Sequence, residues 1–550
     1  NLQAHLQLQY RPINNLTLRV SGGYSDLNHN QTYVKPKKSM DPSQTPVSNT
    51  TFGSNGLKTW IIEPQAEYNQ QIGKGRIDVL VGGTFQSSLT TGSYIYGTNF
   101  SNEALLLNLQ SAQSVTIYSY THTPYRYDAI FGRINYNWNS KYLIDLTARR
   151  DGSSRFGPGN QFGNFGAVGA GWIFSEESFV KRFLPFLNYG KLRGSYGSTG
   201  SANIGDYQYL SQWKPNTYAY DNTSTLSPTA HYNPDYGWEV NKKLEIAMEM
   251  GFLKNRLQAT FSWFRNRSDN QLVSMPLPVY TGFSSVTANL PATVQNTGWE
   301  ATFVSTNIEN GDFKWNTSFN ITISRNKLLA FPGLASSSYA TKYEIGKPLS
   351  LQRKLHFQGV DPETGSPIFE DVNGDGKITT TGASNDLEGR YNLAPSFYGG
   401  LNNEIRYKNW DLSFFFQFTK QKGALYFYSL GAPGTMNNQS VNILKRWQKP
   451  GDITNVPKVS TILSTDYTNF SANSDAAITD ASFARLQNVS LSYTFPNKWV
   501  KHYHSQYTRL YIQGQNLLTI TGYKGADPDT QSLTAIPPVK FLTAGIQITF

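Results

Sequence analysis

Apolar and polar residues alternate one by one along many stretches of this chain, and residues 540–550 show the pattern best. One face of that stretch is apolar and carries Leu542, Ala544, Ile546, Ile548 and Phe550. The other face is mostly polar and carries Phe541, Thr543, Gly545, Gln547 and Thr549. Alternation over this length is what one tilted strand needs to cross a bilayer. A soluble protein can also end on an amphipathic strand, so the interpretation depends on whether the pattern recurs.

The pattern recurs along the whole chain. In residues 313–324, for example, Trp315, Phe319 and Ile321 share one face, and the residues between them are mostly polar. Strands are predicted at residues 2–11, 16–27, 58–71, 76–88, 127–138, 142–152, 163–173, 188–197, 238–250, 256–266, 293–305, 312–325, 396–407, 410–419, 482–494, 508–518 and 540–550. The sequence therefore predicts an all-β chain of about 17 strands.

The connections between the predicted strands alternate between short and long. The short ones are residues 12–15, 72–75, 254–255, 307–311 and 408–409; the long ones are 28–57, 89–126, 198–237, 267–292, 326–395 and 420–481. This arrangement is typical of a transmembrane antiparallel β-barrel of the outer membrane, with tight periplasmic turns and long external loops. A soluble β-sandwich would not place its long loops consistently at one end. One connection, residues 176–187, has the pattern of a short amphipathic helix instead of a tight turn.

Composition agrees with a membrane barrel. Aromatic residues make up 14% of the chain and charged residues only 15%, whereas a soluble globular chain carries about 25% charge. Uncharged polar residues replace the missing charges, which suits strands with one lipid face and one wet face. Aromatic residues gather at predicted strand ends, as in a membrane girdle, for example at Trp172, Trp315 and Trp410. No apolar run approaches the roughly 18 residues that a transmembrane helix needs.

The charge and the cysteine count narrow the possible partners. The chain has no cysteine, which excludes disulfides, Cys-ligated zinc and thiol catalysis. The formal net charge of +11 suggests an acidic partner such as lipopolysaccharide. The lipid bilayer around the strands is a second expected partner. Basic residues form no run of about five or six, so nucleic acid is not an expected partner.

Enzymatic chemistry finds no support in the sequence. The 7 histidines are scattered, and no HExxH, GxSxG or GxxxxGK[ST] motif is present. His502 and His504 share a strand face or a turn and are the one pair that resembles a metal site. The sequence therefore predicts a protein that is not an enzyme and requires no cofactor.

Seven stretches carry a resemblance to a known family: residues 132–179, 192–210, 237–270, 371–379 (DVNGDGKIT), 407–418 (YKNWDLSFFFQF), 481–496 and 510–550. They resemble the SusC/RagA-type TonB-dependent transporters of the outer membrane, in the same order and over nearly the whole chain. The resemblance implies a barrel of about 22 strands with an N-terminal plug inside it. It also implies a TonB box reached from the periplasm and a SusD-like surface lipoprotein that closes over the top.

On this resemblance, residues 1–550 are the C-terminal portion of the barrel with its long extracellular loops, and hold the last 17 or so of about 22 strands. The plug, the TonB box and the first strands would be absent, and TonB would act through that missing region. The implied function is TonB-dependent import of a nutrient, with a glycan or oligosaccharide as the first expectation and an oligopeptide as the second. The alternatives are a structural or secretion-associated outer-membrane barrel without nutrient import, and a hydrolase at the barrel rim.

Residues 371–379 have the spacing of a calcium-binding loop. The expected ligands are Asp371, Asn373, Asp375, the carbonyl of Lys377 and Thr379. Gly382 stands where such loops place a bidentate Glu. A structural Ca²⁺ would brace an external loop. The alternative is a Gly/Asx-rich turn that is ordered by its own backbone hydrogen bonds.

The long loops carry aromatic residues among Asn, Ser and Thr. Flat rings stack on sugar faces or peptide groups, and amides bond to hydroxyls. The candidate substrate-binding residues are Tyr94, Tyr96, Tyr118, Tyr207, Tyr209, Trp213, Tyr232, Trp238, Tyr426 and Tyr428. The alternative is structural, because Tyr and Asn also fill loops that pack on themselves.

The most charged junction between a strand and a loop contains Arg149, Arg150, Asp151, Ser153 and Arg155. These residues could make polar contacts with the plug or the substrate. The preferred interpretation is a set of internal salt bridges on the lumen wall.

Overall fold

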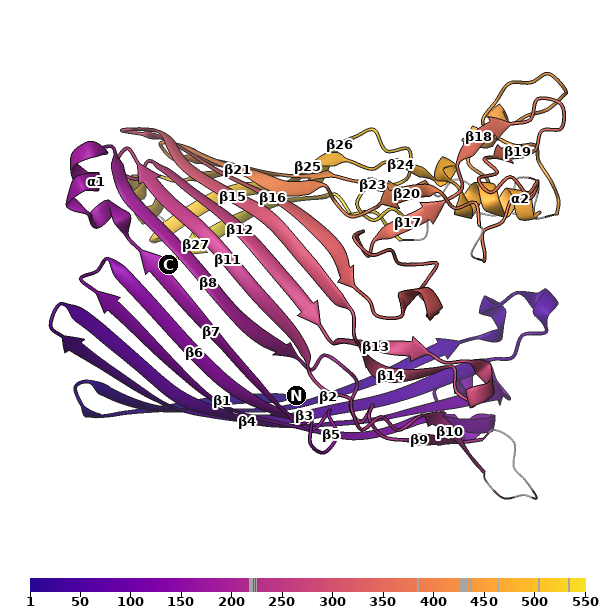
Figure 1. Cartoon of the computed structure of the whole chain (residues 1–550), viewed down its shortest axis with the longest axis horizontal. Helices are drawn as coiled ribbons and strands as arrows, with labels where there is room; N and C mark the ends of the chain where they lie inside the picture. The colour runs from indigo at the N-terminus through magenta and orange to yellow at the C-terminus, as the bar shows by residue number, and fades with distance from the viewer. Residues whose placement is uncertain are drawn as a thin grey trace. The chain divides into compact units, whose positions relative to one another are not determined.

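The chain forms one large antiparallel sheet. A computed structural model describes residues 1–216, 221, 223, 225–382, 385–425, 434, 438–462, 464–502, 505–532 and 535–550. The sheet has 17 strands, which confirms the predicted number (Figure 1). They are β1 (Leu2–Ile13), β2 (Leu16–Lys35), β3 (Asn49–Ile72), β4 (Gly75–Phe100), β5 (Ala112–Trp138), β6 (Tyr142–Ser153), β7 (Phe162–Trp172), β8 (Leu187–Ser201), β11 (Glu239–Phe252), β12 (Leu257–Asp269), β15 (Thr293–Asn310), β16 (Phe313–Ala330), β21 (Phe397–Tyr407), β22 (Trp410–Lys420), β25 (Phe483–Thr494), β26 (Tyr507–Thr521) and β27 (Phe541–Thr549).

Successive strands of the sheet pair with each other in antiparallel fashion. From β1 to β6 each strand pairs with the next one along the chain. The same holds through β15, β16, β21, β22, β25, β26 and β27. The turn between β21 and β22 is tight, because Tyr407 pairs with Trp410 and Lys408 has a φ of +53°. This turn confirms the predicted short connection at residues 408–409.

Smaller elements lie within the long connections. Among the described residues, five two-stranded sheets pair β9 (Gln212–Pro215) with β10 (Leu226–Ala230), β13 (Gln271–Pro276) with β14 (Ser285–Leu290), β17 (Leu351–Lys354) with β20 (Gly389–Asn392), β18 (Phe357–Val360) with β19 (Pro367–Phe369), and β23 (Lys422–Ala424) with β24 (Ile478–Asp480). The short helices are α1 (Ser178–Phe183), α2 (Thr465–Thr468) and α3 (Asn497–His502). Single helical turns lie at Lys37–Ser39, Pro42–Gln44, Glu103–Leu105, Leu109–Ser111, Phe174–Glu176, Val279–Thr281, Leu334–Ser336, Val441–Lys445, Asn469–Asn473 and Asp475–Ala477. The helix α1 confirms the helical connection predicted within residues 176–187.

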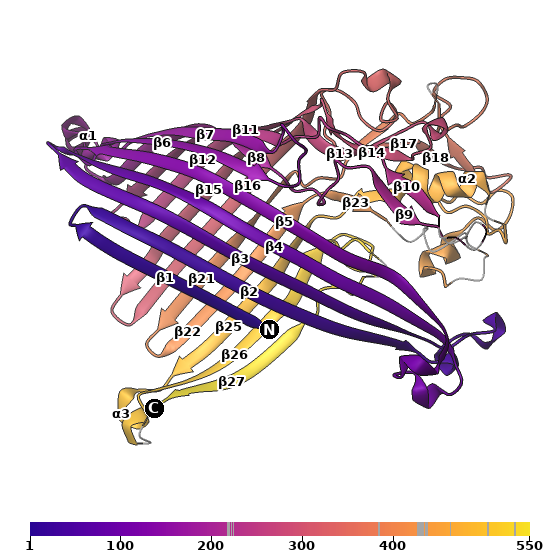
Figure 2. The same ribbon diagram turned by 90° about the horizontal axis from the view of Figure 1, so that it is seen from below.

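The first long connections are shorter than predicted. Residues 28–57 and 89–126 were expected to be loops, but β2, β3, β4 and β5 continue through most of them (Figure 2). The pairing extends to Lys35 opposite Asn49 and to Tyr96 opposite Thr116. β5 alone has 27 residues, which span roughly 90 Å against about 30 Å of hydrocarbon. The alternation of apolar and polar residues ends within these strands, but the hydrogen-bonded ladder continues because it does not depend on side-chain polarity.

Contact density divides the chain into two compact units. One unit comprises Asn1–Gly171, Ser195–Lys243 and Ser268–Pro291, and the other comprises Trp172–Gly194, Leu244–Arg267 and Ala292–Phe550. The alternation predicted for the last strands is visible in the second unit, where Leu510, Ile512 and Leu542 are all exposed on one face. Within the described ranges, no helix is both long and apolar enough to cross a membrane.

Candidate functional site

Three candidate aromatic residues lie on the extended hairpin of the first unit, not in a loop. Tyr94 and Tyr96 belong to β4, and Tyr118 belongs to β5. The rings of Tyr96 and Tyr118 are tilted by 60° with their centroids 5.1 Å apart. The Tyr94 hydroxyl accepts a hydrogen bond from Asn55 Nδ2 at 3.4 Å. Tyr118 is 66% exposed, so its face is open to a flat ligand.

Trp238 lies in a packed aromatic cluster. Its ring centroid is 4.9 Å from that of Phe156 and 5.6 Å from that of Phe165. Its Nε1 donates to the carbonyl of Gln161 at 3.1 Å. Phe156 and Tyr236 are almost fully buried, and burial raises the pKa of Tyr236 to about 12. These contacts give Trp238 a packing role, in line with the structural alternative for the loop aromatics.

Tyr207 and Tyr209 tie one long connection to its neighbours within the first unit. The Tyr207 hydroxyl donates to the carbonyl of Pro124 on β5 at 2.7 Å. The Tyr209 ring packs on Gly157, where an added Cβ would lie 3.1 Å from the ring. The Tyr209 carbonyl accepts from the backbone N–H of Asn233 at 3.0 Å. Both residues therefore fix loop geometry.

Two other candidates are open to solvent. Trp213, on β9, is 58% exposed, and Tyr232 is 47% exposed. They and Tyr118 are the candidate rings most accessible to a ligand among the residues that the structure describes. Tyr426 and Tyr428 lie outside the described residues.

The 371–379 loop is ordered by its own side chains. The Asp371 carboxylate accepts from the backbone N–H groups of Gly374 and Gly376, both at 2.8 Å. The Asn373 amide oxygen accepts from the N–H of Asp375 at 2.9 Å. These bonds are the Asx turns of the structural alternative. In the part of the chain that is described, no group of three or more His, Asp or Glu residues is placed to hold a metal ion. A Ca²⁺ here stays a prediction.

The side chain of Asp386 holds this loop through hydrogen bonds to its backbone. It is fully buried, and its carboxylate accepts from the N–H groups of Val372 at 3.0 Å and Thr379 at 2.7 Å. Burial by itself raises the pKa of Asp386, but the backbone N–H donors outweigh burial and the net pKa is lowered. The carboxylate is therefore held ionised as a structural acceptor.

A hydrogen-bonded trio that the sequence did not reveal lies beside the apolar core of the loop region. Asp475 accepts from His356 Nδ1 at 2.8 Å and from the Tyr391 hydroxyl at 2.9 Å. Its other oxygen accepts from the N–H of Phe357 at 2.9 Å. The adjoining core consists of Leu355, Phe369, Tyr467 and Phe470. The hydrogen bond to Asp475 raises the pKa of His356. Burial, as the larger cause, and the hydrogen bond to Asp475 together raise the pKa of Tyr391 to about 12.

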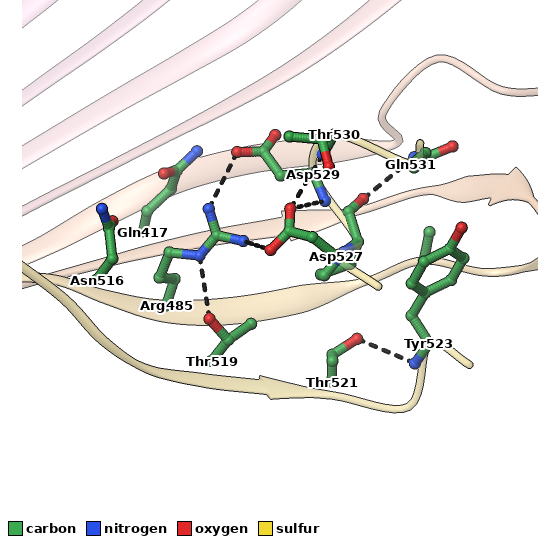
Figure 3. Close-up of polar contacts among 12 residues, drawn as sticks. Gln417, Arg485, Asn516, Thr519, Thr521, Tyr523, Asp527, Asp529, Thr530 and Gln531 are labelled. Atoms are coloured by element: carbon green, nitrogen blue, oxygen red, sulfur yellow. Dashed lines mark hydrogen bonds and ion pairs between the residues drawn. The ribbon is translucent and has the colours of Figure 1, made fainter. Parts of the chain in front are cut away.

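A buried arginine holds the connection between β26 and β27 in place, and the sequence did not reveal it (Figure 3). Arg485 on β25 is 1% exposed. Its guanidinium lies 2.5 Å from Asp527 and 3.3 Å from Asp529, and its Nε donates to Thr519 Oγ1 at 3.1 Å. The other Asp527 oxygen accepts from the N–H groups of Asp529 and Thr530 at 3.0 Å. A cavity of about 340 Å³ adjoins this cluster.

The charged junction at the end of β6 contains ion pairs, as the preferred interpretation predicted, and their position on a lumen wall stays a prediction. Arg149 pairs with Asp151, and its Nη2 donates to the Tyr127 hydroxyl at 2.6 Å. Arg155 pairs with Asp206 at 2.8 Å, so it joins the strand end to the next long connection.

A polar cavity of about 690 Å³ lies at the tight-turn end of β16, β21, β22, β25 and β26. Its charged lining residues are Lys314, Arg406, Lys408, Arg509, Glu404 and Asp411. Arg406 pairs with Asp411 at 2.6 Å. Arg509 Nε is buried and has no hydrogen-bond partner among the residues described. The charged side chains of this wall can contact a further polypeptide segment or a ligand.

The sequence of this chain is similar to those of several TonB-dependent receptors. The chain is 28% identical over 558 residues to TonB-dependent receptor P3 of Formosa agariphila, covering 96% of this chain and 54% of that protein. It is 29% identical to TonB-dependent receptor SusC of Bacteroides thetaiotaomicron, covering 85% of this chain and 47% of that protein. The chain thus spans about half the length of the curated relatives it matches.

A solved structure of the RagAB peptide transporter has a similar fold. The TM-score is 0.86 at 26% identity, covering 100% of this chain and 62% of that one. The sequence model described as "TonB dependent receptor-like, beta-barrel" matches residues 1–517. The chain belongs to the TonB-dependent receptor β-barrel family, and it is similar to the SusC/RagA-type transporters within it.

Proposed function

We propose that this chain is part of a TonB-dependent importer that takes up a nutrient across the outer membrane. The observation that carries the proposal is the family match over residues 1–517, on a sheet of 17 antiparallel strands. Proteins of this family are outer-membrane proteins, and so is this chain. Its relatives are TonB-dependent receptors and transporters, not enzymes, and the proposed role here is likewise transport without catalysis.

The proposed architecture is a closed barrel of about 22 strands around a plug. The 17 strands would be part of that barrel, and the remaining length of the relatives would correspond to the plug and further strands. The polar cavity of about 690 Å³ supports this proposal, because its charged lining, which includes Lys314, Lys408 and Arg509, can contact a further segment of the protein. TonB would act on the plug from the periplasm.

The proposed cargo is an oligomer that lies beneath a SusD-like surface lipoprotein. A glycan is the first candidate, because the exposed rings of Tyr118 and Trp213 suit sugar faces and the chain resembles SusC. An oligopeptide is the second candidate, because the fold matches the RagAB peptide transporter over the whole chain. Aromatic and amide side chains can bind either kind of cargo, and the net charge of the chain does not favour one over the other.

Calorimetry on the complete protein, purified with its proposed SusD-like lipoprotein partner, tests the proposal. We expect saturable binding of either an oligosaccharide or an oligopeptide series by the pair. A matched control pair carries Trp238→Phe, which keeps an aromatic ring in the packed cluster and should bind as tightly as the wild type. The absence of binding in both series, with a folded pair, would contradict nutrient import and favour a structural or secretion-associated barrel.

A further inference from the structure

The connection between β7 and β8 packs on the outer side of the sheet. Within it, α1 is anchored by Val180, which is 5% exposed. The ring of Phe174 covers Gly190 so closely that an added Cβ would lie 2.4 Å from it. Gly190 shares a strand face with Leu192, which is 43% exposed. The connection therefore folds over the face of β8 that carries exposed apolar residues.

Three phenylalanines of this connection are largely exposed. Phe179, Phe183 and Phe186 are 55%, 73% and 54% exposed. Phe179 and Phe183 are four residues apart in α1 and lie on one side of this helix, and Phe186 lies in the turn that follows the end of the helix at Phe183. Large exposed apolar groups gathered in this way mark a surface that another phase or molecule covers.

This aromatic face continues the apolar outer face of the sheet. Phe186 stacks on Phe252 of β11, with ring centroids 6.2 Å apart and planes 18° apart. Phe252 shares its strand face with Ile246 and Met248, which are 49% and 38% exposed. The Phe186 carbonyl accepts from the N–H of Leu253 at 3.3 Å, so the turn after β11 is part of the same surface (Figure 1). In a membrane protein such a continuous outer face meets lipid.

Two basic side chains lie next to the phenylalanines. Lys181 and Arg182 lie in the last turn of α1 and are both exposed. The Arg182 guanidinium is 5.9 Å from the centroid of the Phe183 ring. Lys181 Nζ is 2.5 Å from Glu176 in a half-exposed pair, so part of its charge remains available. Aromatic rings next to basic side chains are the composition of segments that lie in the interface of an anionic membrane.

We propose that Phe179, Phe183 and Phe186 insert into the phospholipid leaflet at the tight-turn end of the strands, with Lys181 and Arg182 against the lipid phosphates. Tight turns face the periplasm in barrels of this kind, so this leaflet is the inner one. The occupant is lipid and not a soluble protein, because the aromatic face is continuous with the strand surface that already faces the bilayer. The proposal rests on the outer-membrane location and is independent of the imported cargo.

Site-directed spin labelling tests the proposal directly, because the chain has no cysteine and each introduced cysteine is a unique labelling site. The Phe183→Cys protein would carry a nitroxide in vesicles of phosphatidylethanolamine and phosphatidylglycerol. We expect its accessibility to oxygen, relative to a water-soluble nickel complex, to exceed several-fold that of Leu107→Cys, which is 70% exposed in another connection. Ile246→Cys on the outer face of β11 provides the reference for lipid. Heat-modifiable gel migration confirms that each variant is folded.

Two results would overturn the proposal. A label at residue 183 that matches Leu107→Cys would mean that the segment is in water, and a label shielded from both reagents would mean that protein covers it. The role of the phosphates has its own test in the same vesicles. Lys181→Glu with Arg182→Glu should move the label toward water, whereas Lys37→Glu with Lys38→Glu, the same charge change elsewhere, should not. An equal response of the two double variants would refute the phosphate contact.

Discussion

Replacing Arg485 with methionine measures how far the stability of the connection between β26 and β27 depends on one buried cation. Arg485→Met keeps an unbranched apolar stem but removes the guanidinium that pairs with Asp527 and Asp529. Because Asp527 is only 7% exposed, its carboxylate is left buried without a cation. Removing one partner of a buried pair costs about 3–5 kcal/mol. Asp527 keeps its hydrogen bonds from the N–H groups of Asp529 and Thr530, so the lower end of about 3 kcal/mol is expected.

Hydrogen exchange of residues 525–532 is the assay, because a loss of about 3 kcal/mol speeds exchange through local opening by about a hundredfold. Lys420→Met is the matched control. The pair of Lys420 with Asp480 is 2.6 Å long, close to the 2.5 Å of Arg485 with Asp527, but its side chains are 50% and 60% exposed. An exposed pair contributes about 0–1 kcal/mol, so exchange near residue 480 should change only several-fold. Equal effects of the two variants would refute the argument that burial sets the magnitude.

Three further predictions concern the long connections. The hydrogen bond that His356 donates to Asp475 raises the pKa of His356 above 6.5, so the pair contributes fully to stability below about pH 6.5 and its contribution is lost as the pH rises through the raised value. The protection factor of the residue 357 amide, which corrects for the intrinsic pH dependence of exchange, should fall over this range in the wild type but stay level in His356→Gln. Calorimetry should show Ca²⁺ binding that is lost in Asp371→Ala, and identical heats in both proteins would leave only a hydrogen-bonded turn. Trp238→Ala should destabilise the folded protein by about 3 kcal/mol because it empties a packed cluster, whereas Trp213→Ala should leave the melting temperature unchanged and weaken cargo binding. The reverse outcome for the two tryptophans would contradict their assigned roles.

The membrane-spanning part of the fold was predictable because lipid acts on every second residue. Alternation in residues 313–324 and 540–550 reflects a local requirement, so each strand can be found without knowing its neighbours. The prediction failed for the outer halves of β4 and β5, where Tyr96 pairs with Thr116. Side-chain polarity does not follow the strand period there, as the adjacent Ile117 and Tyr118 show, although the backbone ladder continues.

The contacts of the long connections were not predictable, because they join residues far apart in sequence. Arg485 and Asp527 are 42 positions apart, and His356 and Asp475 are 119 apart. Nothing in the local pattern around either pair distinguishes it from the other charged residues of the loops. The aromatic candidates show the same limit, because the sequence assigned one role to Trp238 and Trp213, whereas the structure packs the first and exposes the second.

The outer half of β5 creates a hazard during assembly. β5 pairs with β6 only from Tyr127 onward, whereas its pairing with β4 continues to Ala112. Val115 and Ile117, on the part that extends beyond β6, are 51% and 69% exposed. An unpaired strand edge is a template on which a second copy can add its own strand, and Pro124 and the many polar residues of this stretch oppose such pairing. The edge of β5 therefore combines a site at which copies can pair with residues that keep them apart.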